Sequence, residues 1–505
     1  MSSVVLALLL SSSAIGAPPD PQQLADRIDD HIEAAWKDVQ PAPISDDAEF
    51  LRRISLDLTG RIPTPRDIHD FLADRDPNKR RKWIDDLLES PRAAAHFANL
   101  WRAELLPEAA ANREALFFQP GFEAWLRERF RAKVGYDRLV RELLAVPIAS
   151  NGETPQTVFR DPNSPNALAF FAVKDAQPEN LASATTRIFL GIRIECAQCH
   201  NHPFASWTQE QFWSQAAFFA GIERQGNGVF APLSEAPEKH EVVPVNGKKA
   251  VSAVFLDDKL PMWKDKTPPR ALLAEWITSP TNPYFARATV NRVWGQLFGT
   301  GIVDPVDDFH DENAPSHPKL LDELAQALVD SKFDLSYIVK SICLSKAYQR
   351  TSRRTHPSQA NGRIYANHVV KSMTGEQFYD SLVRVIGFRD TDNRNSPRSA
   401  LLTKFAPQGV LSEPQTSIPQ ALSLMNGRFI ASATDLERNP TLIAVTSTPN
   451  WTTDERIEAL YLLALSRKPT PTEAERMRVY VRADVERLAD VFWVLLNSAE
   501  FRLNH

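Results

Sequence analysis

The end of one helix and the start of the next can be read in Phe50-Leu-Arg-Arg-Ile-Ser-Leu-Asp-Leu-Thr-Gly-Arg-Ile-Pro-Thr-Pro65. Apolar residues recur there at three- and four-residue spacings, at Leu51, Ile54 and Leu58, which is the period of one face of an α-helix. Thr64 and Pro65 then begin a new helix, because a hydroxyl caps the free N–H groups and proline fits the first turn. The stretch predicts a mainly α fold.

The same helical period continues over most of the chain. It predicts helices over 123–144, 179–194, 270–277, 285–298, 319–329 and 335–348. A further helix after Trp207 carries an aromatic face with Phe212 and Trp213, which packs in the core or covers a bound group. The helical period stops between about Gly226 and Leu260, where Asn246-Gly247 separates two β-rich runs and indicates a hairpin.

We therefore expect a mainly α protein with two helical domains and a small β-hairpin insert between them. The expected division is a signal peptide at 1–17, a helical domain at 18–225, a β-rich connector at 226–262 and a second helical domain at 263–505. A chain of 505 residues is long enough for two or more domains of about 150 residues each.

The first residues are typical of an export signal. A short apolar run, Val4 to Leu10, is followed by small residues up to Ala17, although no Lys or Arg precedes the run. No later segment approaches the roughly 20 apolar residues of a membrane-spanning helix. We expect an extracytoplasmic protein, periplasmic or secreted, without an integral membrane segment.

The charge balance excludes nucleic acid as the default partner. The formal net charge is -5 and 24% of the residues are charged, with no concentrated basic face in the sequence. These values describe an ordinary soluble surface.

Covalent haem attachment is predicted by Cys196-Ala-Gln-Cys199-His200. Two thiols at this spacing can each bond one vinyl group of a porphyrin, and the imidazole that follows then lies beneath the iron as its proximal ligand. The sequence does not identify a second axial ligand, because Met262, Met373, Met425 and Met477 have no recognisable haem-loop context.

Two other interpretations of these side chains stay open. Zinc takes thiolate and imidazole donors in a closed tetrahedron, and His202 would be the fourth ligand beside Cys196, Cys199 and His200. Alternatively the two cysteines form a disulfide outside the cytoplasm and no cofactor is bound. Cys343 shares a helical stripe with apolar residues and is expected to be buried.

A second concentration of polar residues lies in the loop from Asp304 to Pro318. Carboxylates and imidazoles at this density could bind a divalent cation or position an acid and a base. No metal-ligand spacing is present, so helix capping and solvation are the stronger interpretation. The residues are Asp304, Asp307, Asp308, His310, Asp311, Glu312 and His317.

Seven motifs together resemble the secreted planctomycete-type cytochrome-related proteins that pair two domains of unknown function, numbered fifteen-forty-nine and fifteen-fifty-three. The resemblance extends from about Asp46 to His505. The motifs are Phe50–Pro65, Phe189–Phe204, Asn282–Trp294, Gly301–Phe309, Pro315–Pro318, Ser417–Gly427 and Leu496–Phe501.

This resemblance adds expectations about partners and role. Members often carry a separate cytochrome-like domain upstream, which is absent here, so at most one haem site is implied. Members are commonly accompanied by secreted sulfatase-like proteins, which implies a link to extracytoplasmic polysaccharide use. The expected partner is such a sulfatase-like protein or a redox partner.

We expect an exported protein that binds one haem c and acts in electron transfer or redox sensing. The alternative is a non-haem scaffold or a glycan- or protein-binding module with a disulfide or a zinc site at the two cysteines. A metal-dependent hydrolase that uses Asp307, Asp308 and His310 has the weakest support, because no nucleophile and base pair is recognisable. Whether the protein is an enzyme is left open.

Overall fold

The computed structural model describes residues 18–112, 114–150, 161, 163–245, 247–387, 398, 402, 433–482 and 484–505. In these residues the chain is mainly α-helical with small two-stranded antiparallel sheets, which confirms the expected fold class. The predicted signal peptide, Asn246, Met425 and the motif at 417–427 lie outside the described residues.

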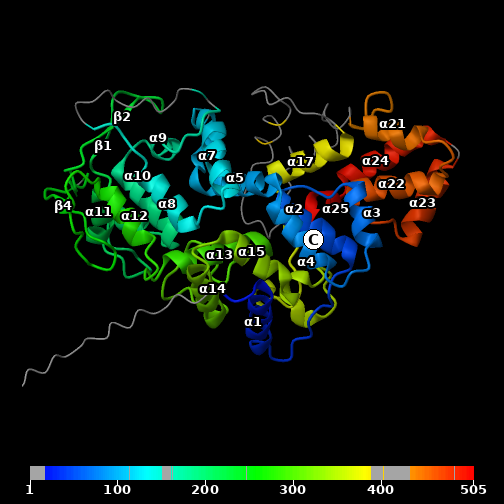
Figure 1. Cartoon of the computed structure of the whole chain (residues 1–505), viewed down its shortest axis with the longest axis horizontal. Coiled ribbons are helices and arrows are strands. Elements are labelled where there is room, and N and C mark those ends of the chain that lie inside the picture. Colours follow the sequence, from blue (N-terminus) through cyan, green and yellow to red (C-terminus); the bar gives the residue numbers. More distant parts are fainter. Residues whose placement is uncertain are drawn as a thin grey trace, which may run out of the picture.

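One lobe, at the left of Figure 1, holds helices from both sides of the predicted connector. Two β-hairpins complete it, β1 (Ile222–Arg224) with β2 (Leu233–Glu235) and β3 (Glu241–Val242) with β4 (Val251–Ser252). Its helices are α7 (Gln119–Arg131), α8 (Tyr136–Leu144), α9 (Ala169–Val173), α10 (Pro178–Thr185), α11 (Gln209–Ala217) and α12 (Pro269–Ile277).

The middle of the molecule holds α1, the first described helix, together with the C-terminus (Figure 1). The long α5 leads from here into the first lobe, ahead of the short α6 (Glu108–Ala111). The helices of the middle are α1 (Pro21–Ala34), α2 (Asp47–Thr59), α3 (Pro65–Ala73), α4 (Lys79–Glu89), α5 (Pro91–Leu105), α13 (Phe285–Phe298), α14 (Pro318–Asp330), α15 (Leu335–Leu344) and α16 (Lys346–Gln349).

A second lobe, at the right of Figure 1, is formed by the last part of the chain. The final strand β6 (Leu503–Asn504) returns to the middle and pairs with β5 (Lys371–Ser372). The helices of this lobe are α17 (Gly375–Ile386), α21 (Pro440–Ser447), α22 (Thr453–Leu465), α23 (Pro471–Val481), α24 (Leu488–Asn497) and α25 (Ala499–Arg502).

Helix α2, where the opening stretch of sequence lies, separates two hydrophobic cores. Its Leu51, Ile54 and Leu58 belong to a large core that extends from Leu24 to Tyr365. Its Leu56 belongs to a second core made mainly by α17 and the C-terminal helices. The large core is continuous across the connector, and the division into domains at 225 and 263 stays a prediction.

The boundaries of α2 follow from its capping residues. The Asp46 side chain accepts a hydrogen bond from the Glu49 N–H, and Gly60 ends the helix at φ 71°. The helix also buries Arg52 and Arg53, which are 1% and 0% exposed. Both guanidinium groups donate to backbone carbonyls, Arg52 to the C-terminal segment and Arg53 to the end of α16. α2 therefore connects the C-terminal segment with the end of α16.

Three of the predicted helices are wrong in their extent. The helix expected over 335–348 is divided into α15 and α16, because Ser345 adopts an extended backbone between them. The helix expected over 123–144 is divided into α7 and α8, because Lys133 adopts φ 49° and turns the chain between them. The helix expected over 179–194 runs from Pro178 as α10, continues as a π-helical turn over Thr186–Leu190 and ends at Gly191, which adopts φ 69°. By contrast, α13 covers the predicted residues 285–298.

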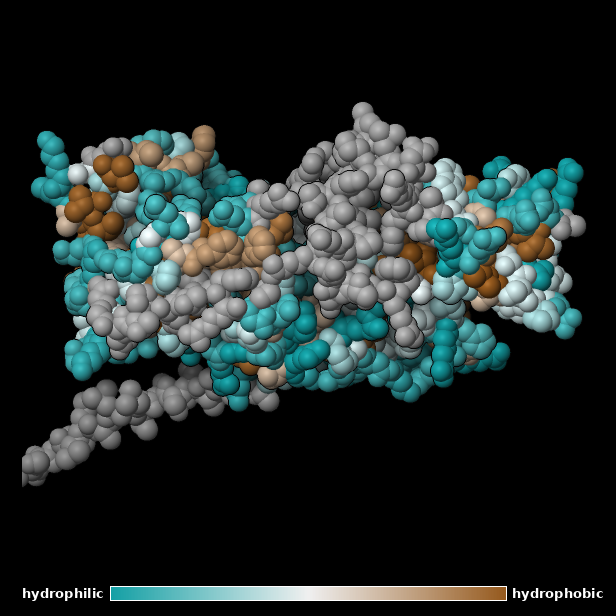
Figure 2. Space-filling view, turned by 90° about the horizontal axis from the view of Figure 1, so that it is seen from above, coloured by the Kyte–Doolittle hydropathy of each residue, from teal (hydrophilic) through white to brown (hydrophobic). Residues whose placement is uncertain are grey.

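The surface seen from above is mostly hydrophilic, with apolar residues in separate patches toward both ends (Figure 2). None of the helices in the described part of the chain is both long and apolar enough to cross a membrane.

Candidate functional site

The two cysteines of the CxxCH motif lie on the surface, just after the chain leaves the core. Gly191 ends the helical segment, and a short 3-10 turn over Glu195–Gln198 then carries Cys196 and leads directly to Cys199. Both thiols are free and exposed, whereas Ala197 between them is buried. The buried alanine anchors the turn, so both sulfur atoms face outward. Cys343 is buried, as expected.

Helix α11 fixes the downstream side of the motif. The carbonyl oxygen of Gln198 accepts hydrogen bonds from the Gln209 Nε2 and the Trp213 Nε1, both at 3.1 Å. The backbone N–H of Gln209 donates to the Asn201 side chain at 3.0 Å. Thr208 begins α11 with a capping box, which orients the helix start toward these partners. The backbone on both sides of His200 is therefore held in place.

The hydrogen bond of His200 defines which ring nitrogen can bind a metal. Its Nδ1 lies 2.7 Å from the carbonyl oxygen of Asn201. A carbonyl oxygen only accepts, so Nδ1 carries the proton and the neutral ring presents its lone pair at Nε2. Ligating histidines usually donate their second ring N–H to a partner of this kind. The exposed His200 ring is thus prepared to act as a ligand.

His202 is bonded in the opposite way. Its Nδ1 accepts from the backbone N–H groups of Phe204 at 3.2 Å and Ala205 at 2.9 Å. A backbone N–H only donates, so Nδ1 supplies the lone pair and Nε2 carries the proton in the neutral ring. The Nδ1 lone pair shapes the turn, and the ring has no second lone pair to offer. The two histidines of the motif therefore differ in their capacity to bind a metal.

The zinc set predicted from the sequence does not come together as a cage in the structure. Within the described residues, which include all four predicted ligands, no group of three or more His, Cys, Asp or Glu side chains is arranged to hold a metal ion. Of the methionines named as possible axial ligands, Met262 is 85% exposed, while Met373 and Met477 pack against the second core.

The aromatic residues near the motif divide between core and surface. Phe212 and Trp213 are 1% and 3% exposed, so the aromatic face of α11 belongs to the core. Trp207 packs against the same core, with its ring 6.4 Å from that of Tyr284. Phe204 is 70% exposed, and it places an apolar surface two residues after His202. A porphyrin is itself a large apolar plate, which this side chain can contact.

The upstream side of the motif is held by the loop predicted as a second candidate site. Asp307 is 6% exposed and accepts hydrogen bonds from Arg187 and Arg193, which precede Cys196. Burial alone would raise the pKa of Asp307, but Arg193, Arg292 and Arg187 outweigh burial and hold this pKa below its usual value. The Asp307 carboxylate is therefore engaged by two guanidinium groups.

The remaining polar residues of this loop do not converge with Asp307. The Asp308 carboxylate lies 3.7 Å from the Nε2 of His310. His317 packs against the ring of Tyr365, and burial lowers the pKa of His317 to about 4. These contacts support the structural interpretation of the loop. They leave the hydrolase hypothesis without a free carboxylate at Asp307.

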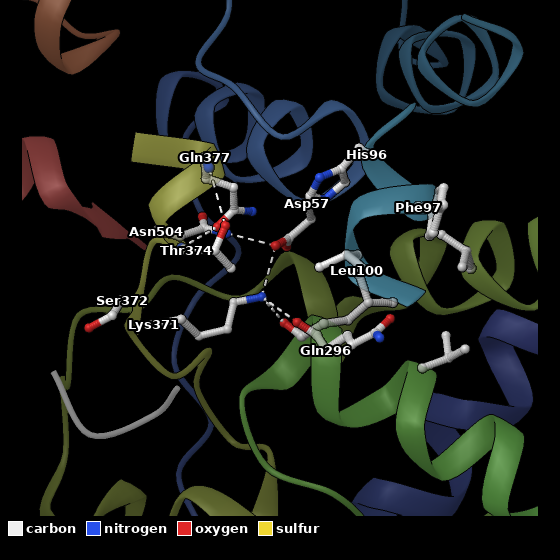
Figure 3. A pocket seen from close by; sticks show the side chains of 13 residues that line it. Asp57, His96, Phe97, Leu100, Gln296, Lys371, Ser372, Thr374, Gln377 and Asn504 are labelled. Carbon is white, nitrogen blue, oxygen red and sulfur yellow. Dashed lines mark hydrogen bonds and ion pairs between the residues drawn. The ribbon is translucent and has the colours of Figure 1, made fainter. Parts of the chain in front are cut away.

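A cavity that the sequence did not indicate lies between α2, α5, α13 and the two last strands (Figure 3). Its polar lining centres on Asp57, which accepts hydrogen bonds from Lys371 at 2.8 Å, Asn504 at 2.7 Å and Tyr348 at 2.7 Å. Lys371 also donates to two carbonyl oxygens at the end of α13. The cavity has a volume of about 30 Å³, which is room for one or two waters.

The groups around this cavity are engaged with one another. The Gln377 side chain donates to the Leu56 carbonyl and accepts from the Thr374 N–H. Burial lowers the pKa of His96 to about 4, so this ring is neutral at physiological pH. Paired groups of this kind join segments of the chain, and we assign the cavity a structural role. No short-range sequence signal could reveal it, because 314 residues separate Asp57 from Lys371.

Comparison with known proteins gives two matches along the chain. Residues 27–224 match PSCyt2, a protein family of unknown function (DUF1549), and residues 269–403 match PSD1, a second family of unknown function (DUF1553). The CxxCH motif lies in the first match and Asp307 in the second. No curated protein and no solved structure matches the chain.

Proposed function

This chain belongs to the proteins that pair a PSCyt2 domain with a PSD1 domain, and we propose that it is an exported protein carrying one c-type haem. Cys196 and Cys199 would bond the porphyrin, and His200 would be the proximal ligand. When bound, the haem iron supplies one-electron chemistry, which suits electron transfer or redox sensing.

The hydrogen bond from His200 to the Asn201 carbonyl is the observation that supports this proposal most strongly. It leaves the Nε2 lone pair of an exposed imidazole directed away from the backbone, next to two free and exposed thiols. The group would be held by one imidazole and two covalent bonds. A zinc site would need His202 as well, and the Nδ1 lone pair of that residue is used by two backbone N–H groups.

The protein's own contribution is to hold these three side chains still. Gln209 and Trp213 fix the Gln198 carbonyl from one side, and Asp307 fixes the entering segment from the other. The exposed Phe204 offers an apolar neighbour to a porphyrin edge. Tight positioning of this kind limits how far the ligand can move when the oxidation state changes.

The proposed location is outside the cytoplasm, supported by the apolar run at 4–10 and the small residues that follow it. A soluble redox partner would exchange electrons at this exposed site. The link to polysaccharide use and to a sulfatase-like protein is part of the same proposal and is supported by the family resemblance alone.

Two histidine variants test the proposal. The protein is exported from a host with c-type maturation machinery, as the wild type, His200→Ala and His202→Ala, and covalent haem is measured by pyridine haemochrome. We expect His200→Ala to lower the covalent haem content by at least about tenfold, while the haem content of His202→Ala stays within about twofold of the wild type. His202→Ala is the matched control, because it removes the same ring two residues away.

Equal losses in both variants would contradict the assignment of the proximal ligand. Colourless wild-type protein that contains one zinc per chain would favour the zinc alternative. Colourless protein without metal would favour the scaffold or binding module.

A further inference from the structure

The segment that enters the CxxCH motif is packed against a loop from the other matched domain. The backbone N–H of Phe309 donates to the Gly191 carbonyl at 2.9 Å. The Phe309 ring covers Gly191 so closely that an added Cβ would lie 2.7 Å from the ring. These contacts place the loop at 304–309 directly on the residues that lead to Cys196.

The same loop delivers a charge to this segment. Oδ1 of Asp307 accepts from Nε of Arg193 at 3.0 Å and from its Nη2 at 2.5 Å, while Oδ2 accepts from Nη1 of Arg187 at 3.0 Å. Arg193 keeps 44% of its side chain exposed and stands three residues before Cys196. One buried carboxylate from the second domain thus partly neutralises two cations next to the first domain's motif.

We propose that Asp307 sets the reduction potential of the CxxCH centre by neutralising the two arginines on the segment that enters it. This inference rests on one part of the proposed function, namely that the motif residues form a redox centre. It also gives the pairing of the two domains a physical reason, because Asp307, which accepts hydrogen bonds from both arginines, comes from the other domain, whereas Glu195 of the first domain lies 4.0 Å from Arg187. Asp307 is a positioning and electrostatic residue and does not bond the centre itself.

The expected effect follows from Coulomb's law. Three residues span at most about 10 Å between Cα atoms, so a separation of about 10 Å sets the scale for the interaction of the Arg193 charge with the motif. A unit charge about 10 Å away changes the equilibrium constant for one-electron reduction by about two- to tenfold, and the factor depends on the local dielectric. Removal of Asp307 unmasks positive charge, which stabilises the reduced state and raises the potential. Salt should weaken the effect, since the Debye length is about 10 Å at 0.1 M ionic strength.

The test uses the full chain without haem, produced in a host that lacks maturation machinery. Oxidised and reduced glutathione are equilibrated with it at about pH 9.5, where free thiols with a pKa near 8.5 are mostly thiolates. Two glutathione thiolates supply two electrons, the Cys196–Cys199 disulfide opens to two protein thiolates, and one glutathione disulfide forms. The ratio of the dithiolate form to the disulfide form of the protein then gives the equilibrium constant for reduction.

Three variants separate charge from structure. We expect Asp307→Asn to raise the equilibrium constant about three- to tenfold, and a tenfold change corresponds to about 30 mV for this two-electron couple. Arg193→Gln should lower it, because it removes a cation. Asp308→Asn removes the same charge one residue away, from a carboxylate that faces His310 and acts on Arg193 through space without a hydrogen bond, and should give a clearly smaller shift. Protein carrying haem should show potential shifts of the same sign.

Shifts of the same sign in Asp307→Asn and Arg193→Gln would overturn the inference, as would equal shifts in Asp307→Asn and Asp308→Asn. The haem-free measurement keeps the two proposals apart: the predicted shifts in a chain that never takes up haem would support the inference while the haem proposal fails. A chain that forms neither a disulfide nor a haem adduct has no redox centre here, and both proposals would fall together.

Discussion

Nζ of Lys371 lies 2.8 Å from Oδ1 of Asp57, and both side chains are almost completely buried, at 5% and 4% exposure. Asp57 lies on α2, in the PSCyt2 match, and Lys371 lies on β5, in the PSD1 match. Asn504, on the last strand, donates to the same carboxylate. One ion pair therefore joins the two matched regions and the final strand.

Replacement of Lys371 should strongly destabilise the fold. We expect Lys371→Met to lower the free energy of unfolding by about 3–5 kcal/mol, because it leaves the buried Asp57 carboxylate without its cation. Denaturant unfolding measures the change. Lys264→Met is the control, since Lys264 and Glu275 form a pair with both side chains more than half exposed, and such pairs contribute about 1 kcal/mol or less. An equal loss of unfolding free energy in the two variants would show that the buried ion pair does not stabilise the fold more than an exposed pair does.

Gly191 should be intolerant of a side chain for two reasons. It adopts φ 69°, and an added Cβ would lie 2.7 Å from the Phe309 ring. Gly228 has φ 86° with nothing within 4 Å of its Cβ position, so Gly228→Ala tests the backbone strain alone. We expect Gly228→Ala to cost about 1–2 kcal/mol and Gly191→Ala to cost clearly more. Limited proteolysis of residues 187–200 should also be faster in Gly191→Ala. Indistinguishable variants would contradict the close packing of the loop on this segment.

The carboxylate of Glu473 should make a pH-dependent contribution to stability. Arg467 binds it through two hydrogen bonds of 2.9 Å, and this contact lowers the pKa of Glu473 from 4.5 to about 2. A lowered native pKa gives stability that is fully present above pH 4.5 and is lost as the pH falls toward 2.

The variant Glu473→Gln should therefore be less stable than the wild type at pH 7, by up to about 1 kcal/mol for a partly exposed pair. The difference should shrink between pH 4.5 and pH 2, which thermal or denaturant unfolding at several pH values would show. Glu486→Gln, at an exposed position, serves as the control. A difference between wild type and Glu473→Gln that is the same at pH 7 and at pH 2 would exclude this role for the Arg467 contact.

The sequence predicts those parts of the fold that depend on local patterns. Helix α13 was predicted at 285–298 because its apolar stripe is unbroken, and Gly299 ends it. The break between α7 and α8 is absent from the prediction, because Lys133 at φ 49° gives no warning of a turn and Gly135, the N-cap of α8, is an isolated glycine of a kind that helices tolerate. The π-helical turn before Gly191 is a rare element without a sequence pattern of its own.

The sequence alone predicts the candidate site only as a motif of two cysteines and one histidine. The spacing of Cys196, Cys199 and His200 identifies the motif, but the difference between His200 and His202 depends on which backbone groups surround each ring. The contact of Asp307 with Arg193 spans 114 residues, and no local pattern in a single sequence predicts a contact between residues so far apart. The density of acidic residues marked the loop as unusual, and its arginine partners became evident only in the structure.

Covalent haem attachment is tested most directly by intact mass together with a pyridine haemochrome spectrum. The protein is exported from a host with c-type maturation machinery, beside the double variant Cys196→Ser/Cys199→Ser. We expect a c-type band and a mass increment of one haem in the wild type, with both lost in the double variant. Wild-type protein of unmodified mass and without visible absorption would contradict the haem proposal.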